Sequence, residues 1–264
     1  MFRASGGSIF RKMNDQAKWP AGYGKRVLAE VDSTNAEAAR LAPLLTGPEW
    51  ILALSQTAAR GRRGRAWVNP VGNFAATLVM RPNETPDKVA LRSFVASLAL
   101  FDAVVAATGH SRGVTLKWPN DVLLNGGKLA GILLESAGSV AGLSHFAIGI
   151  GVNLCVAPDA GQVEEGALRP VSLLSETGIN VTPEEFLDVL APAYARFEAQ
   201  FVTYGFAPIR TAWLDRAAKL GEVITARTTR DTLTGTFETV DDAGNLVLST
   251  AKSRQVIPAA EVFF

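Results

Sequence analysis

Two lysines stand on either side of a turn signal in the middle of the chain. Lys117 opens the run Lys-Trp-Pro-Asn-Asp at residues 117–121, and Lys128 follows the sequence Asn-Gly-Gly at residues 125–127. An Asn-Gly pair between two apolar runs predicts a β-hairpin, which would hold Lys128 beside the strand that carries Lys117. Two ammonium groups close to one point suit a phosphate group such as those of ATP. Taken alone, Lys128 is more typical of an exposed lysine at a strand edge.

A loop dense in arginine and glycine is the second candidate. Residues 60–65 read Arg-Gly-Arg-Arg-Gly-Arg. Glycine lets the backbone bend sharply and brings N–H groups close to an anion, while arginine makes multi-donor contacts to phosphate or carboxylate. Such a loop repels itself when it is empty, and we expect it to become ordered on an anionic ligand. The alternative is a solvated or RNA-binding basic loop, but RNA binding predicts repeated Arg-Gly units or more basic surface elsewhere, and the chain has neither.

Three weaker signals lie elsewhere in the chain. Residues 33–35 read Ser-Thr-Asn before an expected helix, Gln56 ends an apolar strand, and residues 149–153 read Gly-Ile-Gly-Val-Asn at another strand end. Each has an ordinary structural interpretation: a helix N-cap, a satisfied polar residue, and a bulge or close-packing site. None of the three indicates a function by itself.

The composition excludes several classes of protein. The chain has 264 residues, 48% of them hydrophobic, and a formal net charge of +1, so it can build a sizeable core and its surface is not one large anion-binding field. Its single cysteine, Cys155, rules out an internal disulfide framework or a multi-cysteine metal site and fits a cytoplasmic protein. His110 and His145 have no metal-ligand spacing, so no protein-held metal is predicted. We find neither a signal peptide nor an apolar run of the roughly 20 residues that a membrane span needs.

The order of apolar runs and turn residues predicts a mixed α/β domain over residues 25–219. Two long helices are expected, one closed by Gly109 and one capped by Thr182. A capping box of Thr34 with Glu37 is expected at a shorter helix. The expected strands are 25–31, 51–56, 74–81, 114–118, 122–124, 128–136 and 145–154, the expected helices are 36–41, 87–108, 183–204 and 208–219, and the expected loops are 57–73 and 157–170, the second a candidate lid.

The pattern changes after Gly221. Residues 222–264 contain short apolar runs separated by turn sequences and no helical pattern, which predicts a small β-barrel appended to the larger domain. Residues 1–24 are expected to be a disordered extension, in which Met13 is an alternative start. The three expected units are therefore residues 1–24, 25–219 and 220–264. The expected strands of the last unit are 222–227, 233–240, 245–249 and 255–257.

Taken together and in this order, the signals resemble the motifs of the bacterial biotin protein ligases. Residues 33–35 resemble the start of that family's biotin pocket, and residues 56–67 resemble its Gly/Arg-rich biotin and adenylate loop. The Lys-Trp-Pro-Asn-Asp run matches a motif of the family, residues 128–135 (Lys-Leu-Ala-Gly-Ile-Leu-Leu-Glu) match its catalytic-lysine strand, and residues 149–153 are similar to its Gly-Ile-Gly-Ile-Asn element. Several motifs in one order are far more specific than any one of them.

The resemblance runs from about Val27 to the C-terminus and implies a fold and an activity. The fold is the mixed α/β catalytic domain of the biotin/lipoate ligase type, followed by a small SH3-like β-barrel. The activity is a two-step reaction in which ATP, with Mg²⁺, activates biotin as biotinyl-5′-AMP, and the biotinyl group then passes to a lysine of a biotin carboxyl carrier protein domain. The resemblance assigns catalytic roles to Lys128, Arg62 and Lys117. It assigns biotin or ATP binding to Ser33, Thr34, Asn35, Gln56, Arg60, Gly61, Arg62, Arg65, Trp67, Asn120, Asp121, Lys128, Gly131 and Asn153.

The chemistry of biotin favours some of the same residues. Its ureido ring needs both a donor and an acceptor, which the Ser33 hydroxyl and the Gln56 amide offer, and its valeryl chain needs apolar walls. A lipoate or octanoate ligase is the nearest alternative, but lipoyl has no ureido ring, and the Arg-Arg followed by Gly-Gly-Gly of lipoate ligases is absent. The non-enzymatic alternative is a biotin sensor or an RNA-binding protein. The presence of both lysines and the arginine loop argues against this alternative.

Two departures from the family pattern bear on these expectations. Ala59 stands where the family usually has glycine, which strains the loop if that position needs a positive φ and is harmless otherwise. The residues before the first expected strand show no helix-turn-helix pattern, so we expect the short, monofunctional type of ligase, which binds neither DNA nor a membrane. Members of the family can dimerise through the catalytic-domain sheet, and no feature of the sequence selects between a monomer and a homodimer.

Overall fold

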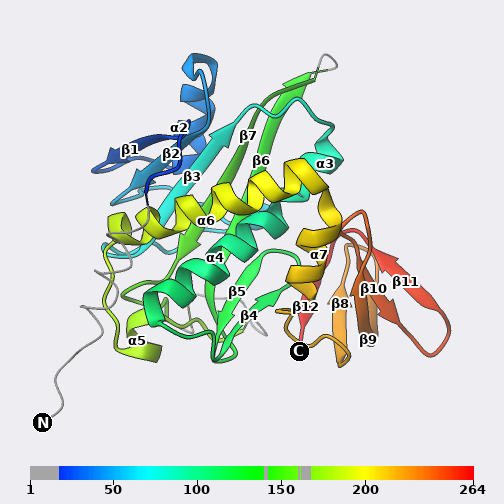
Figure 1. Ribbon diagram of the computed structural model, residues 1–264. Coiled ribbons are helices and arrows are strands. Elements are labelled where there is room, and N and C mark those ends of the chain that lie inside the picture. The colour runs from blue at the N-terminus through cyan, green and yellow to red at the C-terminus, as the bar shows by residue number, and fades with distance from the viewer. Residues whose placement is uncertain (1–17, 140–141, 160, 162–167) are drawn as a thin grey trace, which may run out of the picture.

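The computed structural model describes residues 18–139, 142–159, 161 and 168–264. It contains a seven-stranded sheet with helices on both faces and a five-stranded sheet formed by the C-terminal part of the chain (Figure 1). This confirms the expected fold class, a mixed α/β domain followed by an all-β one. The strands of the large sheet are β1 (Gly24–Leu28), β2 (Glu49–Ala53), β3 (Phe74–Met80), β4 (Val114–Lys117), β5 (Asp121–Leu124), β6 (Gly127–Ser139) and β7 (Gly142–Val152).

The large sheet has the order β1-β2-β3-β7-β6-β5-β4. Strands β1 and β2 are parallel, and the other neighbouring pairs are antiparallel. The helices that accompany it are α2 (Thr34–Leu41), α3 (Pro86–Ala90), α4 (Arg92–Thr108), α5 (Leu173–Thr177), α6 (Pro183–Tyr204) and α7 (Phe206–Leu214), with 3-10 turns at Ala42–Leu44 and Arg62–Gly64.

The large sheet is covered on both faces. Trp50 of β2 belongs to the main core beneath α4 and α6, whereas Ile51, its neighbour in the strand, packs on the opposite face with Ala38 of α2. Helices α4 and α6 lie against each other on one face of the sheet, α4 over β4, β5 and β6 and α6 over β2 and β3, and α4 is buried almost all round (Figure 1). The segment Pro86–Thr108 is apolar enough by length and composition to cross a membrane, but its burial inside this domain makes it a core helix.

The structure confirms one of the two predicted capping boxes and contradicts the other. Helix α6 begins at the predicted capping box, in which the Glu185 carboxylate accepts the Thr182 N–H at 2.9 Å and the Thr182 hydroxyl accepts the Glu185 N–H at 3.2 Å. The predicted capping box of Thr34 and Glu37 is wrong, because Glu37 pairs with Arg40 and no side chain caps α2.

Other helix boundaries also differ from the predictions. The predicted helix 87–108 is two helices that meet at Leu91, and α4 ends at Gly109, whose φ of 77° is left-handed as expected of a glycine that closes a helix. Helix α7 ends at Leu214, five residues before the predicted end, and short turns follow it. Helix α5 was not predicted, because five residues are too few to show a helical period.

Two hairpins connect the strands that carry the predicted motifs. Asn125 and Gly126 both have left-handed backbone, with φ of 50° and 77°, and they join β5 to β6 as the Asn-Gly signal predicted. Strands β6 and β7 form a longer hairpin than predicted, since pairing continues through Ala137 and His145. The turn at Asn125 and Gly126 therefore fixes the position of Lys128, the second residue of β6.

The C-terminal part forms an antiparallel sheet with the order β11-β10-β9-β8-β12. Its strands are β8 (Val223–Arg227), β9 (Thr232–Val240), β10 (Leu246–Ser249), β11 (Arg254–Ile257) and β12 (Glu261–Phe263). Strand β12 was not predicted, because three residues cannot show an alternation. The Trp118 indole N–H donates to the Gly244 carbonyl at 3.0 Å, which ties this part to the residue that follows β4. The turn after α7 is joined to β4 itself, since the Leu116 N–H donates to the Arg216 carbonyl at 2.8 Å.

Two predictions concern segments that are only partly described. Residues 1–17 of the expected extension and residues 160 and 162–167 of the candidate lid lie outside the described residues. The prediction of disorder is wrong for Trp19 and Tyr23, which pack against the main core. The Trp19 indole N–H also donates to the Tyr23 carbonyl at 2.7 Å.

Candidate active site

One cavity of about 510 Å³ collects the predicted motifs. Its wall is built by the start of α2, the loop between β2 and β3, the hairpin region of β4, β5 and β6, the end of β7, and β12 of the C-terminal sheet. Every residue to which a binding or catalytic role was assigned lies on this wall. These residues are Ser33, Thr34, Asn35, Gln56, Arg60, Gly61, Arg62, Arg65, Trp67, Lys117, Asn120, Asp121, Lys128, Gly131 and Asn153. The structure brings them together, and the role of each stays a prediction.

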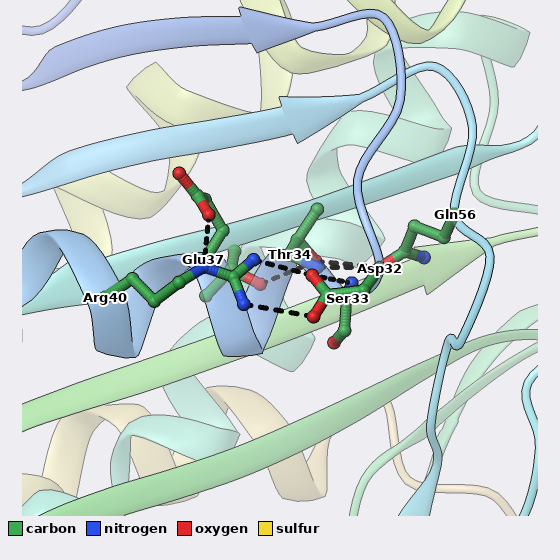
Figure 2. A network of polar contacts seen from close by, with 7 residues as sticks. Asp32, Ser33, Thr34, Glu37, Arg40 and Gln56 are labelled. Carbon is green, nitrogen blue, oxygen red and sulfur yellow. Dashed lines mark hydrogen bonds and ion pairs between the residues drawn. The ribbon is translucent and has the colours of Figure 1, made fainter.

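The start of α2 forms an uncharged polar corner of the cavity (Figure 2). The carboxamide oxygen of Gln56 accepts the Thr34 backbone N–H at 2.8 Å. Because that oxygen is occupied, the amide NH₂ of Gln56 is the group left to face a ligand. Ser33 is buried, and no residue in the described part of the chain forms a hydrogen bond with its hydroxyl. The corner therefore offers a donor from Gln56 and either a donor or an acceptor from Ser33.

An exposed ion-pair cluster outside the cavity orients this corner. The Asp32 carboxylate pairs with Arg40 at 2.6 Å and accepts the Ser33 backbone N–H at 2.8 Å (Figure 2). Arg40 also donates to Glu37 at 2.6 Å. The hydrogen bonds from Arg40 hold the pKa of Asp32 well below its ordinary value. Because exposed ion pairs contribute little to folding stability, we interpret this cluster as a support for the backbone at Ser33.

A pair of glycines makes room on the sheet for the indole of Trp67. Gly131 of β6 and Gly151 of β7 are cross-strand neighbours. A Cβ atom on Gly151 would lie 2.6 Å from the Trp67 ring, and one on Gly131 would lie 3.3 Å from it. Gly149 makes room for Asn35 in the same way, since a Cβ there would lie 2.3 Å from the Asn35 carboxamide oxygen. The glycine-rich end of β7 is therefore a close-packing site for two predicted binding residues.

The arginine loop is more regular than predicted. The Trp67 N–H donates to the Ala59 carbonyl at 3.0 Å, which closes residues 59–67 into a small hairpin. Arg63 and Gly64 at its tip have left-handed backbone, with φ of 57° and 71°. Ala59 is not among the described residues with positive φ. The alanine that replaces the glycine of the motif therefore puts no strain on the backbone.

The arginines of this hairpin have different partners. Arg62 donates to the Asn120 carboxamide oxygen at 3.1 Å, and its burial lowers its pKa. Arg63 and Arg65 both pair with Glu261 of β12, at 3.2 and 2.9 Å. The hydrogen bond from Arg65 lowers the pKa of Glu261. These contacts tie the arginine hairpin to the C-terminal sheet.

The two lysines meet at Asp121. Lys128 Nζ lies 2.8 Å from one oxygen of Asp121, and Lys117 Nζ lies 3.9 Å from the other. Burial lowers the pKa of Lys117, although Asp121 acts in the opposite direction. Lys128 Nζ also lies 5.8 Å from the centre of the Trp67 ring, and Lys117 Nζ lies 5.5 Å from that of Phe264. The prediction that Lys128 lies beside the strand of Lys117 is wrong, because β5 stands between β4 and β6. Both ammonium groups instead meet at Asp121 of β5, where they can hold a phosphate group.

Comparison with known proteins identifies the family. The Biotin/lipoate A/B protein ligase family matches residues 27–153, and the Biotin protein ligase C terminal domain matches residues 219–264. The chain is 62% identical over 238 residues to the biotin--[acetyl-CoA-carboxylase] ligase of Paracoccus denitrificans, and the match covers 90% of this chain and 99% of that protein. The chain belongs to the biotin protein ligase family.

More distant biotin protein ligases match over similar lengths of the chain. The biotin--[acetyl-CoA-carboxylase] ligase of Mycobacterium tuberculosis is 31% identical over 92% of this chain and 90% of its own. The bifunctional ligase/repressor BirA of Bacillus subtilis is 30% identical over 80% of this chain but only 65% of its own. A structure of the Aquifex aeolicus biotin protein ligase in complex with biotin and ATP has a TM-score of 0.75 at 24% identity, and the match covers 90% of this chain and 97% of that one. That likeness confirms the fold.

Two predicted binding asparagines of this biotin protein ligase also hold the backbone around the cavity. The Asn120 amide donates to the Ile132 carbonyl at 2.5 Å, and the Asn153 amide donates to the Val171 carbonyl at 3.0 Å. Replacing either asparagine would therefore disturb the cavity wall as well as any ligand contact.

Three polar residues that line the ligase site or contact its lining were not predicted from the sequence. Glu261 lies on the unpredicted strand β12, Thr77 is fully buried in β3, and Glu135 closes the catalytic-lysine motif without having been given a role. Threonine is an ordinary strand residue, and an acidic residue late in a chain has no local signal. Only the folded structure shows that each of them contacts a predicted site residue.

Proposed function

We propose that this chain is an ATP-dependent ligase that activates biotin as biotinyl-5′-AMP and transfers the biotinyl group to a lysine of a biotin carboxyl carrier protein domain. The observation that carries this function is the division of one cavity into two ends. The corner of Ser33 and Gln56 is polar and uncharged, whereas Lys117, Lys128 and Arg62 make the other side cationic. Biotin has a ureido ring at one end and a carboxylate at the other, and ATP adds phosphates at the carboxylate end.

The first step joins biotin to AMP. A carboxylate oxygen of biotin attacks the α-phosphorus of ATP, a new P–O bond forms, the P–O bond to the β-phosphate breaks, and pyrophosphate leaves with the bonding electrons. Negative charge grows on the phosphate oxygens during this displacement. Lys128 and Lys117, which face the same carboxylate of Asp121, stabilise that charge, and Arg62 adds a half-buried guanidinium.

The second step transfers the biotinyl group. The neutral amine of the acceptor lysine attacks the carbonyl carbon of the mixed anhydride, the C–O bond to AMP breaks, and the amine nitrogen loses a proton as the amide forms. AMP is a good leaving group, whereas the free carboxylate of biotin is a poor acyl donor. The hairpin of residues 59–67 and the Trp67 ring cover this part of the cavity and keep the adenylate from water.

The polar corner selects the head group. The Gln56 amide can only donate once its oxygen is held by Thr34, so it suits the ureido carbonyl, and the Ser33 hydroxyl suits a ureido N–H. A lipoyl group has no such ring, and binding it would leave the buried Ser33 hydroxyl and the half-buried Gln56 amide without partners. Leaving one buried polar group unpaired costs about 1–3 kcal/mol, so the corner favours biotin over lipoate.

Mg²⁺ fits this site as a partner of ATP. No group of three or more His, Cys, Asp and Glu side chains gathers among the described residues, so the protein has no cage of its own there. Mg²⁺ usually keeps several waters and binds substrate phosphates with one or two carboxylates. Asp121 is the carboxylate between the two lysines, and we propose that it holds the ion, which would neutralise phosphate charge when bound.

One assay tests the proposed function against its alternatives. The protein is mixed with ATP, Mg²⁺ and an apo-carrier domain, with biotin in one sample and lipoate in another, and the mass of the carrier is measured. We expect a biotinyl adduct on one lysine, dependent on ATP, and no lipoyl adduct. A lipoyl adduct would indicate the other activity of the wider family, and no adduct in either sample would contradict a ligase. We also propose a cytoplasmic location, because the reaction consumes ATP.

A further inference from the structure

A line of polar contacts runs behind the uncharged corner of the cavity and ends at the arginine hairpin. Thr34 Oγ1 lies 2.8 Å from Thr77 Oγ1, which lies 2.6 Å from the carboxamide oxygen of Asn35. The Asn35 amide donates to Glu135 at 2.8 Å. The other oxygen of Glu135 faces a guanidinium nitrogen of Arg60 at 3.6 Å. The contacts join α2, β3, β6 and the arginine hairpin.

The number of protons on these groups fixes the direction of the hydrogen bonds along this line. The carboxamide oxygen of Asn35 carries no proton, so Thr77 must donate to it. Thr77 has one hydroxyl proton, so its contact with Thr34 is a hydrogen bond only if Thr34 donates to Thr77. With Thr34 donating to Thr77, the donors of Thr34, Thr77 and Asn35 all point toward the Glu135 carboxylate, which accepts. The Thr34 hydroxyl then does not donate to the Gln56 oxygen 3.2 Å away, which keeps the Thr34 backbone N–H as its donor. Aligned hydrogen bonds of this kind strengthen one another, so the carboxylate at the end affects the whole line.

We infer that Glu135 is a positioning residue for adenylation, an inference that rests on the proposed function. Glu135 is not among the described residues that line the cavity. It holds Asn35, which adjoins the head-group corner, and it attracts Arg60, which lies in the hairpin over the adenylate. By holding both, Glu135 couples the order of the head-group corner to the closed position of the hairpin.

The exposed fractions of these side chains show which of them can be replaced without destabilising the fold. The side chains of Glu135 and Arg60 are 41% and 49% exposed, so their ion pair contributes little to folding stability. Thr77 is fully buried, and losing its hydrogen bonds would destabilise the protein. A variant at Glu135 can therefore test the coupling while the fold stays intact.

The test measures how fast biotinyl-AMP leaves the enzyme. Glu135→Gln keeps an acceptor for Asn35 but removes the charge that attracts Arg60. We expect adenylate release about two- to fivefold faster than in the wild type, as the loss of one exposed ion pair predicts. The same substitution in an Arg60→Ala background should have no further effect, because the pair is already broken. Glu238→Gln is the matched control, since Glu238 pairs with Arg254 at 3.0 Å with similar exposure in the C-terminal sheet, and it should leave release unchanged.

A second pair of variants tests the buried part of the line. Thr77→Ser keeps the hydroxyl and should retain the wild-type KM for biotin, whereas Thr77→Val removes it and should raise that KM several-fold with little change in the KM for ATP. A role in folding alone would lower the melting temperature and leave the two KM values in their wild-type ratio.

The outcomes are distinguishable. A wild-type protein that forms no biotinyl-AMP would contradict the proposed function. Normal adenylate formation with unchanged release in Glu135→Gln, or an equal acceleration in the presence and absence of Arg60, would contradict only the role of Glu135.

Discussion

Replacing Gly151 with alanine tests how the arginine hairpin is seated on the sheet. The new Cβ would lie 2.6 Å from the Trp67 ring, whereas ordinary contacts begin at 3.4 Å. Either the indole or the β6–β7 pair must therefore move. The strands are joined by a long ladder of hydrogen bonds, and Trp67 stands on a half-exposed loop, so we expect the indole to move and the hairpin to open.

The cost of this displacement can be estimated from overpacking. Added methyl groups in packed sites cost about 1–3 kcal/mol, which corresponds to roughly 5- to 150-fold in an equilibrium constant. Because the cost falls on the closed position of the hairpin, it should weaken binding of biotinyl-AMP by that factor and lower the melting temperature little. Gly131→Ala is the graded control, since its Cβ would lie 3.3 Å from the same ring and should weaken binding less.

Calorimetric titration with a non-hydrolysable biotinyl-AMP analogue, together with thermal melting, measures both effects. Binding by Gly151→Ala that equals the wild type would refute the reasoning. So would a stronger effect of Gly131→Ala, or a large fall in melting temperature with unchanged binding by the folded protein, because the strain would then lie in the sheet.

The remaining predictions concern the two ends of the cavity and the C-terminal sheet. Lys128→Ala should slow biotinyl-AMP formation sharply while biotin still binds, and a wild-type adenylation rate in that variant would remove Lys128 from the mechanism. Gln56→Leu or Ser33→Ala should weaken biotin binding by about 1–3 kcal/mol and leave ATP binding nearly unchanged, and an unaltered Kd for biotin in both would place the ureido ring elsewhere. Because burial lowers the pKa of Lys117, its ammonium loses its proton at a lower pH than that of an ordinary lysine. The adenylation rate should therefore fall at alkaline pH, and Lys117→Arg should keep that rate up to a higher pH. Identical pH–rate profiles for the two proteins at alkaline pH would count against this. Glu261→Gln should weaken retention of the adenylate because Arg63 and Arg65 lose their ion pairs with this carboxylate, and full retention would show that the C-terminal sheet does not hold the hairpin.

The predictions that succeeded rest on local chemistry. The Asn125-Gly126 turn and the Thr182 capping box involve neighbouring residues whose backbone or hydrogen-bonding demands are readable in a short window. The grouping of distant residues in one site was predicted from the order of the motifs, because that order matched a family whose sheet brings distant strand ends together. The corner at Ser33 was predicted only through that match, since Ser-Thr-Asn before a helix looks like an ordinary cap.

The predictions that failed needed long-range information. Glu37 was expected to cap α2, but Arg40 takes its carboxylate, and a capping pattern cannot show which competing partner wins. Glu261 meets Arg65 across 196 residues, and the strand that presents it is too short to predict. The conformation at Ala59 depends on how the hairpin closes on itself, so whether alanine is tolerated there could not be read from the motif.

The distribution of charge around the cavity explains how a nearly neutral chain can bind a polyanion. Among the described residues, six cationic side chains line the cavity, at Arg60, Arg62, Arg63, Arg65, Lys117 and Lys128, and the carboxylates of Asp121 and Glu261 stand among them. Each of these carboxylates holds two cations at once. The pairs reduce the repulsion that would open an empty cavity, yet an excess of positive charge remains for the phosphates of ATP. An arriving phosphate therefore finds cations already held close together, so less of the binding energy is needed to gather them. The carboxylates therefore hold the cations in place for a ligand that is itself negatively charged. Removing Glu261 or Asp121 should weaken nucleotide use for this reason, even though each substitution removes a negative charge.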